Sequence, residues 1–423
     1  PGLPAPQAQA AATPAPAPQP VRKIAIFFDG TANDEGSDTN VKRLHSLVTL
    51  QDRPDIAALY VHGVGTDADV TGMATGSGIN QRAQIAYEFI LNHYRAKAPG
   101  LPPDRIYIFG FSRGAYAARI LTSMLYHAGL PQPAERGRCR LTSTERAGVV
   151  HNAVAPIEAH YSPIDESRRR SGVQKKLATL NSDPVLLPAA RGCFATPSPA
   201  VEVEVLGLWD TVEALGVANW GSRLLSKTGL SQHLEDVDVP NIRYGDKLCN
   251  VQHALHAVSI DDNRAWIFTP LLLTRRHHFD GCEGGRAAML DDSGRLRTGR
   301  LREVWFAGAH SDVGGGYGDS ALSGVSLNWM IGELNRIAQA TPAMSQGSLH
   351  PGLLPPGARV REDVFGSSHN PSTGFFDLTY HEIHRDLYRY AHARKAGGPP
   401  SPVDVFSGRV CVHPSVFERR NRV

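Results

Sequence analysis

One serine in the chain stands where it could act as a nucleophile. Ser112 lies in the segment GFSRG, residues 110–114, which follows an apolar run and precedes a stretch of small, helix-favouring residues. A G-x-S-x-G between a strand and a helix forms a sharp turn, the nucleophile elbow, that exposes the serine. Glycines flank the serine because a Cβ there would collide with the neighbouring strand or helix. The pattern predicts covalent catalysis through Ser112, with a plain structural turn as the alternative.

A serine nucleophile needs a base to accept its proton and an acid to orient that base. Asp210 and His310 each follow directly after a predicted strand, and they come after the serine in the order acid, then histidine. Parallel sheets gather reactive groups at the carboxyl ends of their strands. We therefore predict Ser112 as nucleophile, His310 as general base and Asp210 as the orienting acid. The alternatives are His256 and His413 for the base and Asp312 for the acid.

Acyl transfer also needs backbone N–H donors for the oxyanion that forms at the carbonyl. One donor is predicted at Arg113, the residue after the nucleophile. The other is predicted in the loop after the first strand, at Gly30 and Thr31, where glycine allows a close approach of the backbone.

Strands and helices that position these groups alternate along the chain. Apolar runs predict strands at 23–28, 57–61, 106–109, 201–209 and 303–309. Helical spacing predicts helices at 40–50, 81–94, 326–338 and 381–393, and also at 252–260, which contains His256. Strands that are apolar throughout indicate a parallel sheet covered on both faces. The predicted fold class is α/β, an α/β-hydrolase fold with a mostly parallel central sheet and helices on both faces.

A single domain is expected from residue 21 to residue 423. Residues 1–20 are rich in proline and alanine, which predicts a disordered tether, and they lack the basic start and apolar core of a signal peptide. Irregular stretches near 136–200, 216–247 and 341–379 are predicted to be lid-like insertions. Nowhere do 18 apolar residues run together, so no transmembrane helix is predicted.

The composition is that of a globular protein, with 41% hydrophobic and 20% charged residues among 423. A net charge of +3 is too small to argue for a nucleic-acid partner. The five cysteines are widely spaced without a C-x-x-C pair, which argues against a cysteine-held metal and leaves room for one or two disulfides. Neither a metal nor a cofactor is predicted, because serine, histidine and aspartate suffice for the predicted chemistry.

A set of motifs in the chain resembles one known family. The motifs are IFFDGTAND at 26–34, YVHGVGT at 60–66, GFSRGAYAAR at 110–119, LGLWDTV at 206–212, HAVSIDDNR at 256–264, WFAGAHSDVGGGY at 305–317 and VHPSVFERR at 412–420. They resemble the bacterial and fungal α/β-hydrolase family that contains type VI secretion phospholipase effectors of the first lipase class. The resemblance implies hydrolysis of lipid carboxylic esters, of the lipase or phospholipase A type, by a Ser-Asp-His triad. It matches the triad to Ser112, Asp210 and His310.

The resemblance also implies partners and a location. The substrate would be a lipid or phospholipid ester, met through transient contact with a membrane surface. A secretion-machinery protein and an immunity protein would be partners of an antibacterial effector, which is made in the bacterial cytoplasm and acts after secretion, or in a periplasm. The larger effectors carry a C-terminal membrane-targeting region, whereas this sequence stops shortly after VHPSVFERR, so we expect no stable docking through such a region. The alternatives are a general esterase, a hydrolase of non-lipid acyl bonds, and a binding protein on the hydrolase fold.

Overall fold

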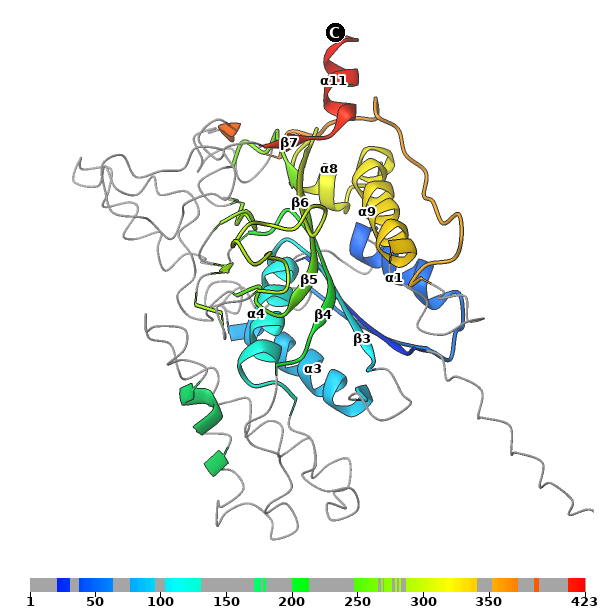
Figure 1. The fold of residues 1–423 in the computed structure, drawn as a ribbon. Coiled ribbons are helices and arrows are strands. Elements are labelled where there is room, and N and C mark those ends of the chain that lie inside the picture. The colour runs from blue at the N-terminus through cyan, green and yellow to red at the C-terminus, as the bar shows by residue number, and fades with distance from the viewer. Residues whose placement is uncertain are drawn as a thin grey trace, which may run out of the picture.

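A seven-stranded parallel sheet forms the centre of the computed structural model (Figure 1). Its strands are β1 (Lys23–Phe28), β2 (Ile56–Val61), β3 (Arg105–Phe111), β4 (Val203–Trp209), β5 (Val251–Ser259), β6 (Leu301–Phe306) and β7 (Cys411–Val412). They lie in the order β2-β1-β3-β4-β5-β6-β7, and each neighbouring pair of these strands is parallel. The structure describes residues 21–30, 38–63, 77–95, 103–130, 171–175, 178–179, 200–212, 247–264, 268, 270–275, 278–279, 281–282, 287–340, 352–371, 384–387 and 410–422.

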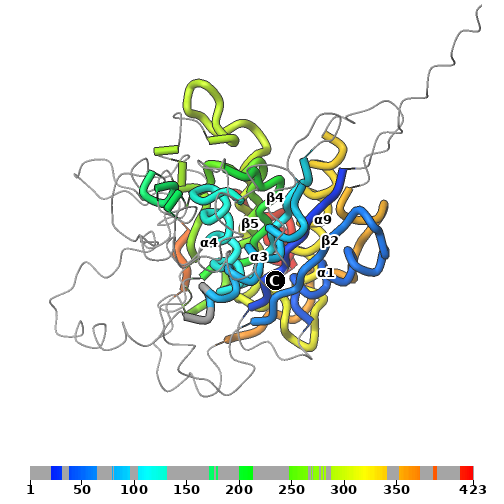
Figure 2. The backbone as a smooth tube through the Cα atoms, turned by 90° about the horizontal axis from the view of Figure 1, so that it is seen from below, coloured from blue at the N-terminus to red at the C-terminus, as the bar shows by residue number. Residues whose placement is uncertain are grey.

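Helices cover both faces of this sheet. Helices α3 (Ser77–His93) and α4 (Arg113–His127) lie on one face, and α1 (Asn40–Thr49) and α9 (Ala321–Ala340) lie on the other (Figures 1 and 2). Successive side chains of β1 point to opposite faces, so Ile24 and Ile26 pack with α3 and α4 while Ala25 and Phe27 pack with α1 and α9. Burial on both faces explains why the strands are apolar throughout. The predicted fold class, an α/β-hydrolase fold, is confirmed.

The segment around His256 is strand β5, so the prediction of a helix at 252–260 was wrong. Alanine and leucine in this segment favour a helix locally, but its place between β4 and β6 overrides that weak preference. His256 is directly opposite Glu303 on β6, with its Nδ1 2.9 Å from Glu303 Oε2. This cross-strand partner satisfies a polar side chain that would otherwise be costly to bury in a sheet.

The other predicted elements either overlap a strand or helix of the structure or lie largely outside the described residues. Predicted strands at 23–28, 57–61, 106–109, 201–209 and 303–309 overlap β1, β2, β3, β4 and β6, and the predicted helices at 40–50, 81–94 and 326–338 overlap α1, α3 and α9. Residues 1–20, nearly all of 136–200 and 216–247, and the helix at 381–393 apart from 384–387 lie outside the described residues. Within the predicted insertion at 341–379, residues 352–371 are described. They pack on α9, where Asn328 Nδ2 donates to Val360 O at 2.9 Å.

The described helices include none that is both long and apolar enough to cross a membrane. Two further short helices are α8 (His310–Gly314) after β6 and α11 (Pro414–Arg420) after β7.

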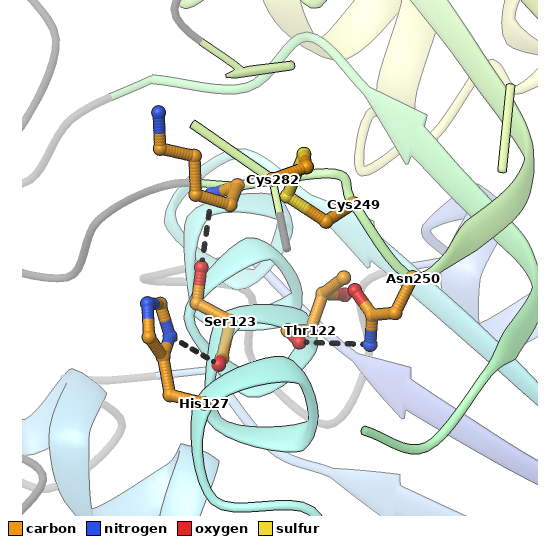
Figure 3. Close-up of a disulfide and its surroundings, with 7 residues drawn as sticks. Thr122, Ser123, His127, Cys249, Asn250 and Cys282 are labelled. Atoms are coloured by element: carbon orange, nitrogen blue, oxygen red, sulfur yellow. Dashed lines mark hydrogen bonds between the residues drawn. A yellow bond between two sulfur atoms is a disulfide. The ribbon is translucent and has the colours of Figure 1, made fainter. Parts of the chain in front are cut away.

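A disulfide between Cys249 and Cys282 fastens the start of β5 to the segment near residue 282, beside α4 (Figure 3). Both cysteines belong to the buried cluster on the α4 face. In the same region, Ser123 Oγ on α4 accepts a hydrogen bond from the Lys247 backbone N–H at 3.1 Å. The disulfide therefore cross-links a region in which α4 already contacts the residues just before β5.

Replacing Cys282 by serine is expected to lower the free energy of unfolding by about 2–4 kcal/mol, because the bridge spans 33 residues and restricts the unfolded chain. Urea titration without reductant measures the change. Cys411→Ser is the matched control, since Cys411 is exposed and is the free cysteine among the described residues. Equal urea midpoints for Cys282→Ser and the unaltered protein would contradict a stabilising disulfide.

Candidate active site

Ser112 occupies the turn between β3 and α4 with φ 59° and ψ −127°, a conformation that residues with a side chain rarely adopt. The two flanking glycines make the turn sterically feasible. A Cβ on Gly110 would lie 2.5 Å from Ala115 Cα, and a Cβ on Gly114 would lie 2.4 Å from Phe28 O. The backbone of the predicted elbow is therefore strained and tightly packed between β1 and α4.

Asp210 leaves the sheet next to Ser112. Phe111 and Trp209 are partners in the β3–β4 register, and the Ser112 N–H donates to Trp209 O at 3.0 Å. The residues that follow these partners, Ser112 and Asp210, therefore emerge at the same edge. Asp210 is completely buried and also has a positive φ, of 36°.

His310 reaches Asp210 from α8. Its Nδ1 lies 2.5 Å from Asp210 Oδ2. The imidazole ring packs against the rings of Phe111 and Phe268, with centroid distances of 4.7 and 4.8 Å, and the His310 backbone N–H donates to Asp262 Oδ2 at 3.2 Å. Because Asp210 engages Nδ1, Nε2 is the ring nitrogen that can exchange a proton with another group.

The structure adds Arg385 and Ser259 to the predicted residues. Nη1 and Nη2 of Arg385 donate to Asp210 Oδ1 and Oδ2 at 2.7 and 3.0 Å. Ser259 donates to the same carboxylate through its N–H at 3.0 Å and through its hydroxyl at 3.1 Å. Burial alone would raise the pKa of the Asp210 carboxyl, but Arg385 and His310 hold that pKa far below its usual value. No motif in the sequence distinguishes Arg385 from the many other arginines.

The predicted alternatives have other partners. The Asp312 carboxylate lies 2.6 Å from His369 Nδ1 and accepts from the Ala309 N–H at 3.0 Å. His413 caps α11, where its side chain accepts from the Ser415 N–H at 3.3 Å. His256 lies between Glu303 on one side and the Thr211 N–H, at 3.1 Å, on the other. Of the candidates considered, His310 and Asp210 are the histidine and acid that the structure pairs beside Ser112.

The predicted oxyanion donors are only partly defined. Arg113 is the first residue of α4, where backbone N–H groups lack partners within the helix. The Gly30 N–H donates to Asp29 Oδ1 at 2.7 Å, so it is engaged by its own neighbour. Thr31 lies outside the described residues.

Within the described part of the chain, no group of three or more His, Cys, Asp or Glu side chains is placed to hold a metal ion. The adjacent carboxylates of Asp261 and Asp262 have protein partners. Asp261 Oδ2 accepts from the Gly308 N–H at 2.6 Å, and Asp262 Oδ2 lies 2.7 Å from Arg264 Nη2. Both carboxylates thus fix the loop that carries His310.

A parallel sheet with helices on both faces and a strained serine after β3 defines an α/β-hydrolase fold. The family model for the catalytic domain of type VI secretion phospholipase effectors of the Tle1-like kind matches residues 22–333. The chain belongs to this Tle1-like family.

Two individual proteins resemble the chain more distantly. A Saccharomyces cerevisiae protein described as uncharacterized protein YEL023C is 23% identical over 395 residues, covering 74% of this chain and 56% of the yeast protein. The solved structure of the Tle1 effector bound to the VgrG spike of the type 6 secretion system has 19% identity and a TM-score of 0.31, covering 71% of this chain and 52% of the Tle1 chain. The chain thus spans about half the length of these relatives.

Proposed function

We propose that the chain is a serine hydrolase of lipid carboxylic esters in which Ser112, His310 and Asp210 form the catalytic triad. The contact of 2.5 Å between His310 Nδ1 and Asp210 Oδ2, beside the strained Ser112, is the observation that carries this proposal. Membership in the Tle1-like family supports the choice of lipid esters, and phospholipids in particular.

In this mechanism, the Ser112 Oγ bonds to the ester carbonyl carbon while its proton moves to His310 Nε2. The resulting imidazolium gives that proton to the departing alcohol oxygen as the ester C–O bond breaks, which leaves an acyl group on Ser112. A water molecule then attacks the acyl carbon, giving one proton to His310, and the serine recovers a proton as the carboxylic acid leaves.

Asp210 remains ionised throughout these steps, because Arg385 and His310 hold the pKa of its carboxyl so low. It orients the His310 ring and stabilises the imidazolium without accepting the proton. The oxyanion is assigned to the Arg113 N–H and to a second donor in the loop after β1. For that second donor we favour Thr31 over Gly30, because the Gly30 N–H is bonded to Asp29.

We further propose that the chain acts as a type VI secretion effector on membrane phospholipids after export, with a secretion-machinery protein as carrier and an immunity protein as antagonist. The family match supports the secretion route. The solved Tle1 effector is bound to a VgrG spike, so a spike protein is the first carrier to examine for this chain.

Hydrolysis of p-nitrophenyl esters of increasing acyl length, run beside phospholipid vesicles with the released fatty acid quantified, tests the proposed activity. We expect turnover of long-chain esters and release of fatty acid from vesicles. Turnover confined to short esters would indicate a general esterase instead. The absence of turnover on every ester would contradict the hydrolase proposal.

A further inference from the structure

Two arginines belong to the helices that start at the edge of the sheet from which Ser112 emerges. Arg113 directly follows the serine and begins α4, and Arg82 is in the second turn of α3. Helices α3 and α4 follow the parallel strands β2 and β3, so both helices start from the carboxyl edge of the sheet. They pack side by side (Figure 1), with Ala83 and Ala115 in one buried cluster.

These two guanidinium groups influence one another and have no carboxylate partner among the described residues. Burial and the neighbouring Arg82 lower the pKa of the Arg113 guanidinium to about 10, and no acid among the described residues opposes this shift. Burial also lowers the pKa of Arg82. The Nη1 atom of Arg82 is buried and has no hydrogen-bond partner in the described part of the chain.

Two other arginines near the site have carboxylate partners. Arg385 is bonded to Asp210, and Arg264 is bonded to Asp262. Partly burying two like charges without a counter-charge is unfavourable for the folded protein. The arrangement becomes favourable when a bound anion supplies the missing charge and the missing acceptor, and guanidinium groups match the geometry of phosphate oxygens.

We propose that Arg82 and Arg113 form an anion subsite that binds the phosphate group of a phospholipid while Ser112 attacks one of its acyl esters. This inference rests on the proposed function and names the residues that recognise the phosphate group of its substrate. In a glycerophospholipid the phosphate and the esters share one glycerol unit, so a phosphate subsite beside the nucleophile brings an ester carbonyl to the serine. A neutral acylglycerol lacks the group that the arginines recognise.

The test compares kcat/KM on two lipids with the same acyl chains, phosphatidylcholine and diacylglycerol, each dispersed in neutral detergent micelles. Both lipids carry no net charge, so attraction of the protein to a charged surface does not enter the comparison. Arg82→Gln is expected to lower the ratio of kcat/KM for phosphatidylcholine to that for diacylglycerol by about 10- to 100-fold. Arg82→Lys, which keeps the charge, should recover part of the ratio.

Arg420→Gln is the matched control, because it removes one positive charge from the exposed end of α11, beyond the opposite edge strand β7. It should leave the ratio unchanged. Arg82→Gln should also melt no lower than the unaltered protein, since it removes a charge that has no carboxylate partner among the described residues. If Arg82 has only a structural role, Arg82→Gln will lower the melting temperature and leave the ratio of kcat/KM for the two lipids unchanged. That result would overturn the subsite.

Inhibition of p-nitrophenyl ester hydrolysis by inorganic phosphate distinguishes a lipid phosphate from a free one. A reduced lipid ratio, with phosphate inhibiting only weakly, supports the lipid headgroup as ligand. Inhibition that Arg82→Gln relieves, together with an unchanged lipid ratio, would overturn that choice in favour of free phosphate. If esters are hydrolysed normally but Arg82→Gln changes neither the lipid ratio nor the inhibition by phosphate, only the subsite is overturned. If the unaltered protein hydrolyses no ester, the proposed function is overturned as well.

Discussion

Replacing Ser112 by alanine is expected to lower kcat for ester hydrolysis by roughly 10⁴- to 10⁶-fold, because it removes the atom that forms the acyl intermediate. The melting temperature should change little. Alanine and serine both carry a Cβ, so the strain of the backbone at φ 59° is the same in both. Steady-state hydrolysis and thermal unfolding of the same preparations measure the two effects.

A second buried serine, on the helix that follows Ser112, provides the control. Ser123 lies on α4 far along the helix from the elbow. Its hydroxyl, shown in Figure 3, accepts a hydrogen bond from the Lys247 N–H. Ser123→Ala should cost about 1 kcal/mol of stability and leave kcat nearly unchanged. Reaction with a fluorophosphonate should label the unaltered protein at Ser112 only. Activity of Ser112→Ala within tenfold of the unaltered protein would rule out this serine as the nucleophile.

Those parts of the fold with a local signal were predictable from the sequence. Ser112 and Asp210 each follow an apolar run, and parallel strands direct their carboxyl ends to one edge, so the sequence already indicated that these two residues meet. The glycines around Ser112 could be assigned to a sharp turn for the same local reason. The structure shows why glycine is needed at position 114, because a Cβ there would lie 2.4 Å from Phe28 O.

Features that depend on distant contacts were not predictable in this way. Strand β5 has a helix-favouring composition, and only its position between β4 and β6, with Glu303 opposite His256, makes it a strand. Arg385 is 175 residues away from Asp210 along the chain, and nothing in its sequence surroundings indicates the pairing. The sequence also does not predict the direction of a side chain. Asp312 is only two residues from His310, but its carboxylate contacts His369.

Replacing Asp210 by asparagine is expected to lower kcat by about 10⁴-fold, because an amide in this position favours the wrong tautomer of the His310 imidazole. Asp312→Asn is the matched control, since Asp312 is the other acid considered and is bonded to His369 instead. We expect Asp312→Asn to retain kcat within tenfold. The opposite pattern, with loss of activity confined to Asp312→Asn, would show that Asp312 is the acid of the triad.

Asp210→Asn also leaves the buried Arg385 without its charged partner, which should destabilise the protein by about 3–5 kcal/mol. The double variant Asp210→Asn/Arg385→Met removes both charges, so it should recover much of the stability while kcat stays low.

Urea titration against pH gives a further test. Because the pKa of the Asp210 carboxyl is far below its usual value of 3.8, its contribution to stability is complete above that pH and is lost as the pH falls through the lower value of the folded state. The stability advantage of the unaltered protein over Asp210→Asn should therefore be full at neutral pH and shrink progressively as the pH falls below 3.8. A kcat that recovered together with stability in the double variant would mean that Asp210 supports the fold and takes no part in orienting His310.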